Sequence, residues 1–254
     1  MMSDFNSKYF RDAAWSQLSG QRLYAALVYL VYELVYSGIN CIFSMSWQLF
    51  LSIFLYVAAL ILMYMGIDAD VAALGLHLLM FLAVCLVGAP LGFLIYFLIS
   101  PLVYSFSVIF LENKREGSML NPAFLFKRYK GFARVGGTMV LMYIYTMLWS
   151  FLFCIPAIVK GISYSQTLYV LHDNPELSYN KAIERSMSMM DGYKMRYFKL
   201  LLSFTGWILL CLVTLGIASF WVIPYLQAAN VHFYEFVKEE YEKKTAAAAV
   251  SETV

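Results

Sequence analysis

The chain has 254 residues, of which 62% are hydrophobic and only 13% are charged, and its formal net charge is +2. Soluble domains are roughly 45–50% apolar and about 25% charged, so this composition excludes an ordinary soluble protein and predicts an integral membrane protein. The basic residues stand in short clusters beside apolar stretches, which excludes nucleic acid as a partner and makes membrane lipids the expected one.

Residues 1–21 are predicted to form an N-terminal interfacial helix. Within 6–19, one side of the helix carries apolar residues, namely Tyr9, Phe10, Ala13, Ala14 and Leu18, and Gly20 stops the pattern. This segment lacks the apolar core of a cleavable signal peptide, so the first apolar helix is expected to direct the chain to the membrane.

Residues 22–240 are predicted to form a single membrane domain. A membrane span needs about 20 apolar residues, so the long stretches 23–65 and 71–111 are each expected to hold two segments, with turns within 37–46 and before Pro101. Eight apolar segments result: 22–43, 47–66, 71–99, 101–113, 135–154, 156–172, 197–216 and 221–238. The predicted fold is an all-α, polytopic integral membrane helical bundle of six to eight apolar helices with interfacial amphipathic helices.

Apart from Lys160, lysine and arginine stand in four clusters, at Lys8–Arg22, Lys114–Arg134, Lys181–Lys199 and Lys238–Lys244. Cytoplasmic loops carry an excess of these residues. All four clusters are cytoplasmic if the chain crosses an even number of times between them, which eight spans allow, as do six full spans with two partial helices. The predicted location is the cytoplasmic membrane with both termini inside, and residues 241–254 are expected to be a disordered tail.

The segment after Pro175 is predicted to be a second interfacial helix. Tyr179, Ile183, Met187 and Met190 fall at i, i+4, i+8 and i+11, which places them on one helical face. We expect this face to bind the cytoplasmic leaflet.

Two ionisable residues stand within apolar stretches and suggest an intramembrane polar site. Glu33 is about 16 Å along the helix from Arg22, a depth at which a charge is costly and normally faces protein or water. It is either a neutral carboxyl bonded to a neighbouring helix or part of an ion or proton site. Lys160 either reaches the outer interface with its amine or pairs with Glu33.

Four polar residues, Tyr164, Ser165, Gln227 and Asn230, extend this candidate site. They are expected either to line a polar cavity or to form hydrogen bonds between helices.

The sequence predicts no catalytic, cofactor or metal site. The four cysteines and three histidines stand singly, without the spacing of a metal site. Nucleophile elbows, zinc-protease motifs and phosphate-binding loops are absent from the sequence, which argues against a hydrolase or an ATPase.

Several motifs in the second half of the chain resemble a known family: Ile155–Lys160, Ser163–Ser165, Asp173–Ser178, Ala182–Ser186, Met189–Lys194, Leu202–Trp207, Leu215–Ile217 and Trp221–Tyr225. Together they resemble the bacterial integral-membrane family catalogued as domain of unknown function 975, which is common in Gram-positive bacteria. The resemblance covers about residues 95–240. The family is distantly similar to the membrane domain of some glycerophosphodiester phosphodiesterases, which implies a helical module that lies against lipid.

Three functions are compatible with these features. The first is a non-catalytic polytopic membrane protein that scaffolds a partner protein or a second copy of itself, or that handles lipid. The second is a small transporter, or a transporter subunit, that uses Glu33 and Lys160. The third is a membrane enzyme that acts on lipid.

Overall fold

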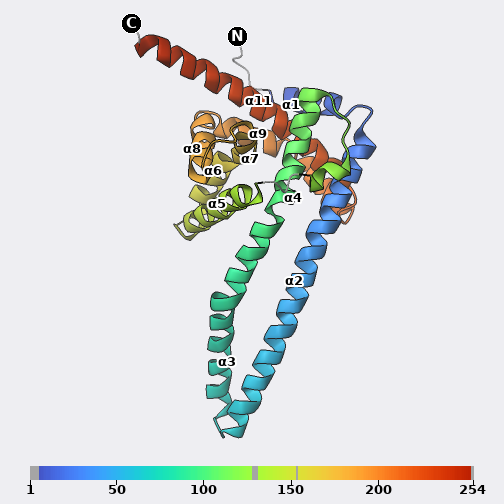
Figure 1. Cartoon of the computed structure of the whole chain (residues 1–254). Coiled ribbons are helices and arrows are strands. Elements are labelled where there is room, and N and C mark those ends of the chain that lie inside the picture. Colours follow the sequence, from blue (N-terminus) through green and yellow to red (C-terminus); the bar gives the residue numbers. More distant parts are fainter. Residues whose placement is uncertain (1–5, 128–130, 153, 253–254) are drawn as a thin grey trace. The chain divides into compact units, whose positions relative to one another are not determined.

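A computed structural model of the chain describes residues 6–127, 131–152 and 154–252 (Figure 1). All regular secondary structure in these residues is helical, which confirms the all-α class. The chain divides into two compact units, one formed by Glu33–Ile99 and the other by Met1–Tyr32 together with Ser100–Val254.

Helix α2 runs without a break over Arg22–Tyr64, so the predicted turn within 37–46 is wrong. The polar side chains that suggested a turn form hydrogen bonds with backbone carbonyls of the same helix. The Ser37 hydroxyl donates to the carbonyl of Glu33, and the Asn40 amide donates to the carbonyl of Tyr36. At 1.5 Å per residue this helix measures about 64 Å, roughly twice the thickness of a hydrocarbon core.

The next apolar stretch is also one helical run. It comprises α3 over Ala69–Ala83, the π-helix η1 over Val84–Gly88, and α4 over Ala89–Glu116. Pro101 lies inside α4, so the predicted turn before it is wrong. Proline has no N–H to donate to the carbonyl one turn earlier. Membrane helices tolerate proline because neighbouring groups form hydrogen bonds to that carbonyl instead.

Within the unit Glu33–Ile99, α2 and α3 form an antiparallel hairpin (Figure 1). Gly66, with a φ of 71°, makes the turn, and the Asp68 side chain accepts a hydrogen bond from the N–H of Asp70 to begin α3. A Cβ on Gly88 would lie 2.7 Å from the Trp47 ring, so only glycine allows this indole to pack against the π-helix. The break predicted between the segments 47–66 and 71–99 is confirmed.

Three stretches of the described chain are long and apolar enough to cross a membrane: Arg22–Tyr64, Asp70–Glu116 and Lys194–Val213. Membrane-length apolar helices are therefore confirmed. The two corrections above reduce four predicted segments, namely 22–43, 47–66, 71–99 and 101–113, to two continuous helical runs.

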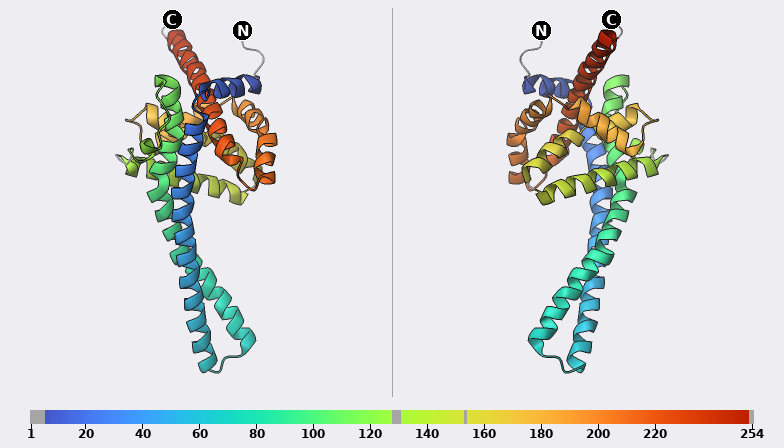
Figure 2. Two further views of the ribbon diagram at one scale, coloured as in Figure 1. Left: turned by 90° about the vertical axis from the view of Figure 1, so that its right-hand side faces the viewer. Right: turned by 90° about the vertical axis from the view of Figure 1, so that its left-hand side faces the viewer.

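In the other unit, α1 over Ser7–Gln17 begins at Asn6, whose side chain accepts a hydrogen bond from the N–H of Lys8. It packs against α11, which spans Ser219–Glu252 (Figure 2). Phe10 is 4% exposed, with its ring centroid 5.7 Å from that of Phe233. Phe10, on the apolar side of α1, therefore contacts α11, whereas Tyr9 on the same side is 61% exposed.

Apart from α5, which has 21 residues, the remaining helices of this unit are short. After the 3-10 helix η2 over Pro122–Phe126 they are α5 over Phe132–Leu152, α6 over Cys154–Tyr164, α7 over Thr167–Asp173, α8 over Tyr179–Met189, α9 over Lys194–Leu202 and α10 over Thr205–Val213.

Two predicted segments, 156–172 and 197–216, are each divided into two helices. The hydroxyls of Ser165 and Ser203, which stand at the divisions, donate to carbonyls three residues earlier and compete with the helical pattern.

Helix α11 continues to Glu252, through the segment that was predicted to be disordered. Alanine has the highest helix propensity, and residues 246–249 are four alanines in succession. One turn earlier, the Lys243 amine lies 3.3 Å from the Glu240 carboxylate, at the i, i+3 spacing that supports a helix.

Candidate functional site

Two of the predicted polar residues lie on α11 and contact tyrosines of neighbouring helices. The Gln227 amide donates to the Tyr169 hydroxyl of α7 at 2.7 Å. The Asn230 side chain accepts a hydrogen bond from the Tyr197 hydroxyl of α9 at 3.2 Å. Both tyrosines are buried, so these bonds join three helices where an unsatisfied polar group would be costly.

Tyr164 and Ser165 lie at the end of α6 and just after it. Tyr164 is 4% exposed, and its ring centroid lies 6.5 Å from that of Tyr145 on α5. The Ser165 hydroxyl accepts a hydrogen bond from the Gln166 amide at 2.9 Å. The Tyr164 contact is a ring contact between helices, and the Ser165 bond joins neighbouring residues of the chain.

Lys160 has contacts within its own unit. Its amine lies 5.0 Å from the centre of the Trp149 ring and 4.0 Å from the Met187 sulfur. Glu33 belongs to the other unit, where its carbonyl accepts the Ser37 hydroxyl. The pairing of Glu33 with Lys160 stays one of the two alternatives that the sequence offers for Lys160.

The apolar face of α8 packs inside the protein. Ile183 is 1% exposed and Met190 is fully buried, while Met187 is half-buried and Tyr179 is 43% exposed. Helix α8 contacts α5, α6, α7 and α11, which cover this face. The prediction that all four residues bind the leaflet is therefore corrected: Ile183 and Met190 hold α8 in the bundle, because the same helical periodicity describes a face against protein or against lipid.

Asp173, at the end of α7, is the centre of the main ionic cluster. Two Arg115 nitrogens donate to its two carboxylate oxygens at 2.6 and 2.8 Å. The Lys238 amine and the Tyr234 hydroxyl donate to the same carboxylate at 2.7 and 2.8 Å. Arg115 also binds Glu235 at 2.7 Å, so one cluster ties α4, α7 and α11 together.

The electrostatic result is a carboxylate that stays ionised. The Asp173 side chain is only 8% exposed. Burial by itself raises the pKa of a carboxyl, but hydrogen bonds from Arg115, Lys238 and Tyr234 outweigh that cost and hold the pKa of Asp173 well below its usual range.

The backbone beside Asp173 is held as well. The Arg134 guanidinium donates to the carbonyls of Leu171 and Pro175, at the C-terminal end of α7. A cation there satisfies carbonyls that the helix leaves without partners and complements the helix dipole.

Residues 153–241 match the family model described as Protein of unknown function (DUF975). The resemblance found in the sequence is confirmed over these residues. Comparison with curated proteins and with solved structures finds no match. The matched region supplies Asp173, Tyr234, Glu235 and Lys238 to the ionic cluster, and Arg115 joins them from outside it.

A polar cavity of about 200 Å³ lies next to the ionic cluster. It is lined by Asp173, Asn174, Arg185, Met189, Tyr234, Lys238, Tyr241 and Glu242. Its charged groups balance, with two carboxylates and two cations. Among the described residues no group of three or more His, Cys, Asp or Glu side chains is placed to hold a metal ion.

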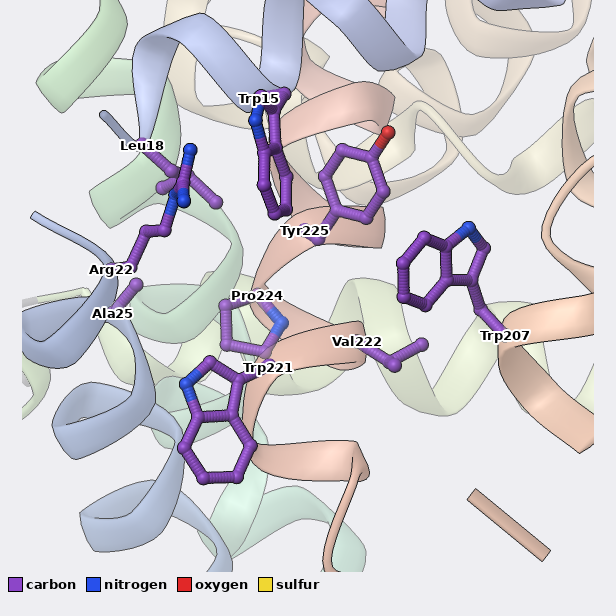
Figure 3. A pocket seen from close by; sticks show the side chains of 9 residues that line it. All are labelled: Trp15, Leu18, Arg22, Ala25, Trp207, Trp221, Val222, Pro224 and Tyr225. Atoms are coloured by element: carbon purple, nitrogen blue, oxygen red, sulfur yellow. The ribbon is translucent and has the colours of Figure 1, made fainter. Parts of the chain in front are cut away.

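A second cavity, of about 170 Å³, is lined almost entirely by apolar groups (Figure 3). Its walls come from α1, the start of α2, α10 and α11, and comprise Trp15, Leu18, Arg22, Ala25, Trp207, Trp221, Val222, Pro224 and Tyr225. The ring centroid of Tyr225 is 5.5 Å from that of Trp15 and 6.0 Å from that of Trp207. The Arg22 guanidinium lies 3.7 Å from the centre of the Trp15 ring.

Sequence reasoning missed both the ionic cluster and the aromatic cavity. The sequence shows Arg115 and Lys238 only as members of basic clusters that indicate topology, and Asp173 only as part of a family motif. One available signal was Asp173 itself, because a carboxylate at the end of an apolar segment needs a cation beside it. The tryptophans carried no signal, because Trp15, Trp207 and Trp221 are far apart in sequence.

Proposed function

We propose that the protein is a non-catalytic, polytopic protein of the bacterial cytoplasmic membrane that handles lipid through its apolar hairpins. The observation that carries this proposal is the turn between α10 and α11. Leu212, Val213, Leu215 and Ile217 surround Gly216, and each is at least 64% exposed. In water such a set would favour aggregation, whereas in a bilayer these side chains contact acyl chains.

Helix α11 supports an orientation in which this turn lies in the bilayer. Trp221, near its start, is 55% exposed, and Lys238 lies 17 residues later in the ionic cluster. At 1.5 Å per residue these positions are about 26 Å apart along the helix, so an interface at Trp221 leaves Lys238 in the aqueous phase and the Gly216 turn in the bilayer. Tryptophan favours a membrane interface and lysine favours the cytoplasmic side, so the interface beside Trp221 is proposed to be the cytoplasmic one, with both termini in the cytoplasm.

The cluster at Asp173 supports a structural role and argues for the non-catalytic alternative. Each of its carboxylates accepts a short hydrogen bond from a cation, so neither Asp173 nor Glu235 is poised as a base or a nucleophile. The lipid-enzyme alternative therefore gains no support from this site.

The proposal is tested by carbonate washing of membranes, followed by native mass spectrometry after gentle extraction. Retention in washed membranes with co-purified phospholipid is the expected result. Retention with a stoichiometric protein partner, or as a stable homo-oligomer without lipid, would favour a scaffold instead. Release of the protein by carbonate would overturn the assignment to the membrane.

A further inference from the structure

We propose that the aromatic cavity binds an acyl segment of an anionic phospholipid whose phosphate lies on Arg22. This inference rests on the proposed lipid-handling function and names the lipid class. Within the cavity, Trp15 and Tyr225 face each other, Trp207 and Trp221 stand on separate sides, and Arg22 lies beside Trp15 (Figure 3).

The side chains that line the aromatic cavity favour an apolar ligand. Apart from Arg22, the side chains around the cavity are aromatic or aliphatic, and they offer few polar atoms to a hydrophilic ligand. A volume of about 170 Å³ is smaller than the roughly 300–1,000 Å³ of pockets that enclose a drug-sized molecule. The cavity therefore takes part of a chain and leaves the rest of the ligand outside.

The positive charge of Arg22 favours an anionic lipid headgroup. Aromatic walls alone could hold a quaternary ammonium group, such as the choline of a zwitterionic lipid. Here the Arg22 guanidinium already covers the Trp15 face at 3.7 Å, and its positive charge repels a second cation. Arginine binds phosphate with two parallel hydrogen bonds, so the same group attracts a lipid phosphate.

The surroundings connect the cavity to the proposed membrane region. Trp207 and Trp221 belong to α10 and α11, on either side of the exposed apolar turn at Gly216. They are 39% and 55% exposed, so each ring lines the cavity on one side and lies on the exposed apolar surface of the hairpin on the other. An acyl chain that lies along this hairpin can enter the cavity without leaving an apolar environment.

Tryptophan fluorescence with brominated phospholipids tests the inference on the full chain. Trp47→Phe with Trp149→Phe removes the two tryptophans that do not line the cavity. Brominated phosphatidylglycerol or brominated phosphatidylcholine is then titrated into nanodiscs of unlabelled phosphatidylcholine. We expect brominated phosphatidylglycerol to reach half-maximal quenching at a mole fraction about fivefold lower than brominated phosphatidylcholine. One surface arginine attracts an anionic lipid by about 1 kcal/mol, which corresponds to about fivefold in affinity.

The control variants separate this site from general attraction to the surface. Arg22→Gln should abolish the fivefold difference, whereas Lys8→Gln, which removes the same charge from α1, should preserve it. Equal quenching by both lipids in the parent protein, or an unchanged difference in Arg22→Gln, would overturn the inference. Either result leaves the proposed function standing if the protein stays in carbonate-washed membranes, whereas release by carbonate removes the proposed function itself.

Discussion

Arg115 and Asp173 are 58 residues apart in sequence and form a two-point ion pair, with the Nη1–Oδ1 and Nη2–Oδ2 distances at 2.6 and 2.8 Å. The pair joins the end of α4 to the end of α7, and Lys238 brings α11 to the same carboxylate. A long apolar helix is thereby anchored to the part of the chain that matches the family.

Asp173→Asn should destabilise the protein strongly. The change leaves Arg115 and Lys238 close together without their common anion, and breaking a buried pair costs about 3–5 kcal/mol. We expect the melting temperature in detergent to fall on the order of 10 °C. Asp191→Asn is the matched control, since the Asp191 side chain is 84% exposed, and it should change the melting temperature little. Equal shifts in the two variants would contradict a structural role for the cluster.

The contribution of Asp173 should depend on pH in a defined direction. Its folded-state pKa is lowered, so its stabilisation is complete above the unfolded-state pKa of about 3.9 and is lost as the pH falls toward the folded-state pKa. The difference in melting temperature between the parent and Asp173→Asn should be constant from about pH 7 to 5 and shrink below about pH 4. A difference that stays constant down to pH 3 would show that the carboxylate is not responsible.

Ile183→Ala should destabilise the protein in pure detergent, and added lipid should not restore the loss. Ile183 is 1% exposed inside the bundle, and truncating a buried isoleucine costs about 2–5 kcal/mol. Lys181→Ala, on the exposed side of α8, is the control and should have little effect. If added phospholipid restored the melting temperature of Ile183→Ala, Ile183 would contact lipid, and α8 would be the interfacial helix that the sequence predicts.

The transporter alternative requires energetic coupling between Glu33 and Lys160. A paired glutamate and lysine predict that Glu33→Gln with Lys160→Met recovers part of the stability that each single change loses. The contacts of Lys160 with Trp149 and Met187 predict additive losses instead, and additivity is the result we expect from melting temperatures of the four proteins. Recovery in the double variant would favour a proton or ion site.

Topology is tested by cysteine labelling in intact cells, in a background without native cysteines. Glu116→Cys and Lys181→Cys lie at exposed positions near two basic clusters and should resist an impermeant maleimide added outside. Met65→Cys, at the turn of the α2–α3 hairpin, should react. Ser186 is unsuitable because it is buried and its hydroxyl donates to the Ser163 carbonyl. External labelling at Lys181→Cys would reverse the proposed orientation.

The sequence by itself determined the all-α class and the presence of apolar helices of membrane length, because composition and the length of apolar runs are local quantities. It predicted apolar helices, the break between the segments 47–66 and 71–99, the amphipathic faces of α1 and α8, and a family resemblance over about 95–240, which is confirmed over 153–241. It did not predict the number of helical runs. Serine and asparagine in α2 bond to the preceding turn, and Pro101 is accommodated inside α4, so neither signal produced a turn.

Only the tertiary structure decided what each face contacts. Periodicity shows that Phe10 and Ile183 lie on apolar faces, but a protein surface and a lipid surface select the same residue types. The partners of Asp173 and the walls of the tryptophan cavity come from helices far apart in sequence. Such contacts depend on how the helices pack, and packing is fixed by the complementarity of whole surfaces, which no single segment of sequence contains.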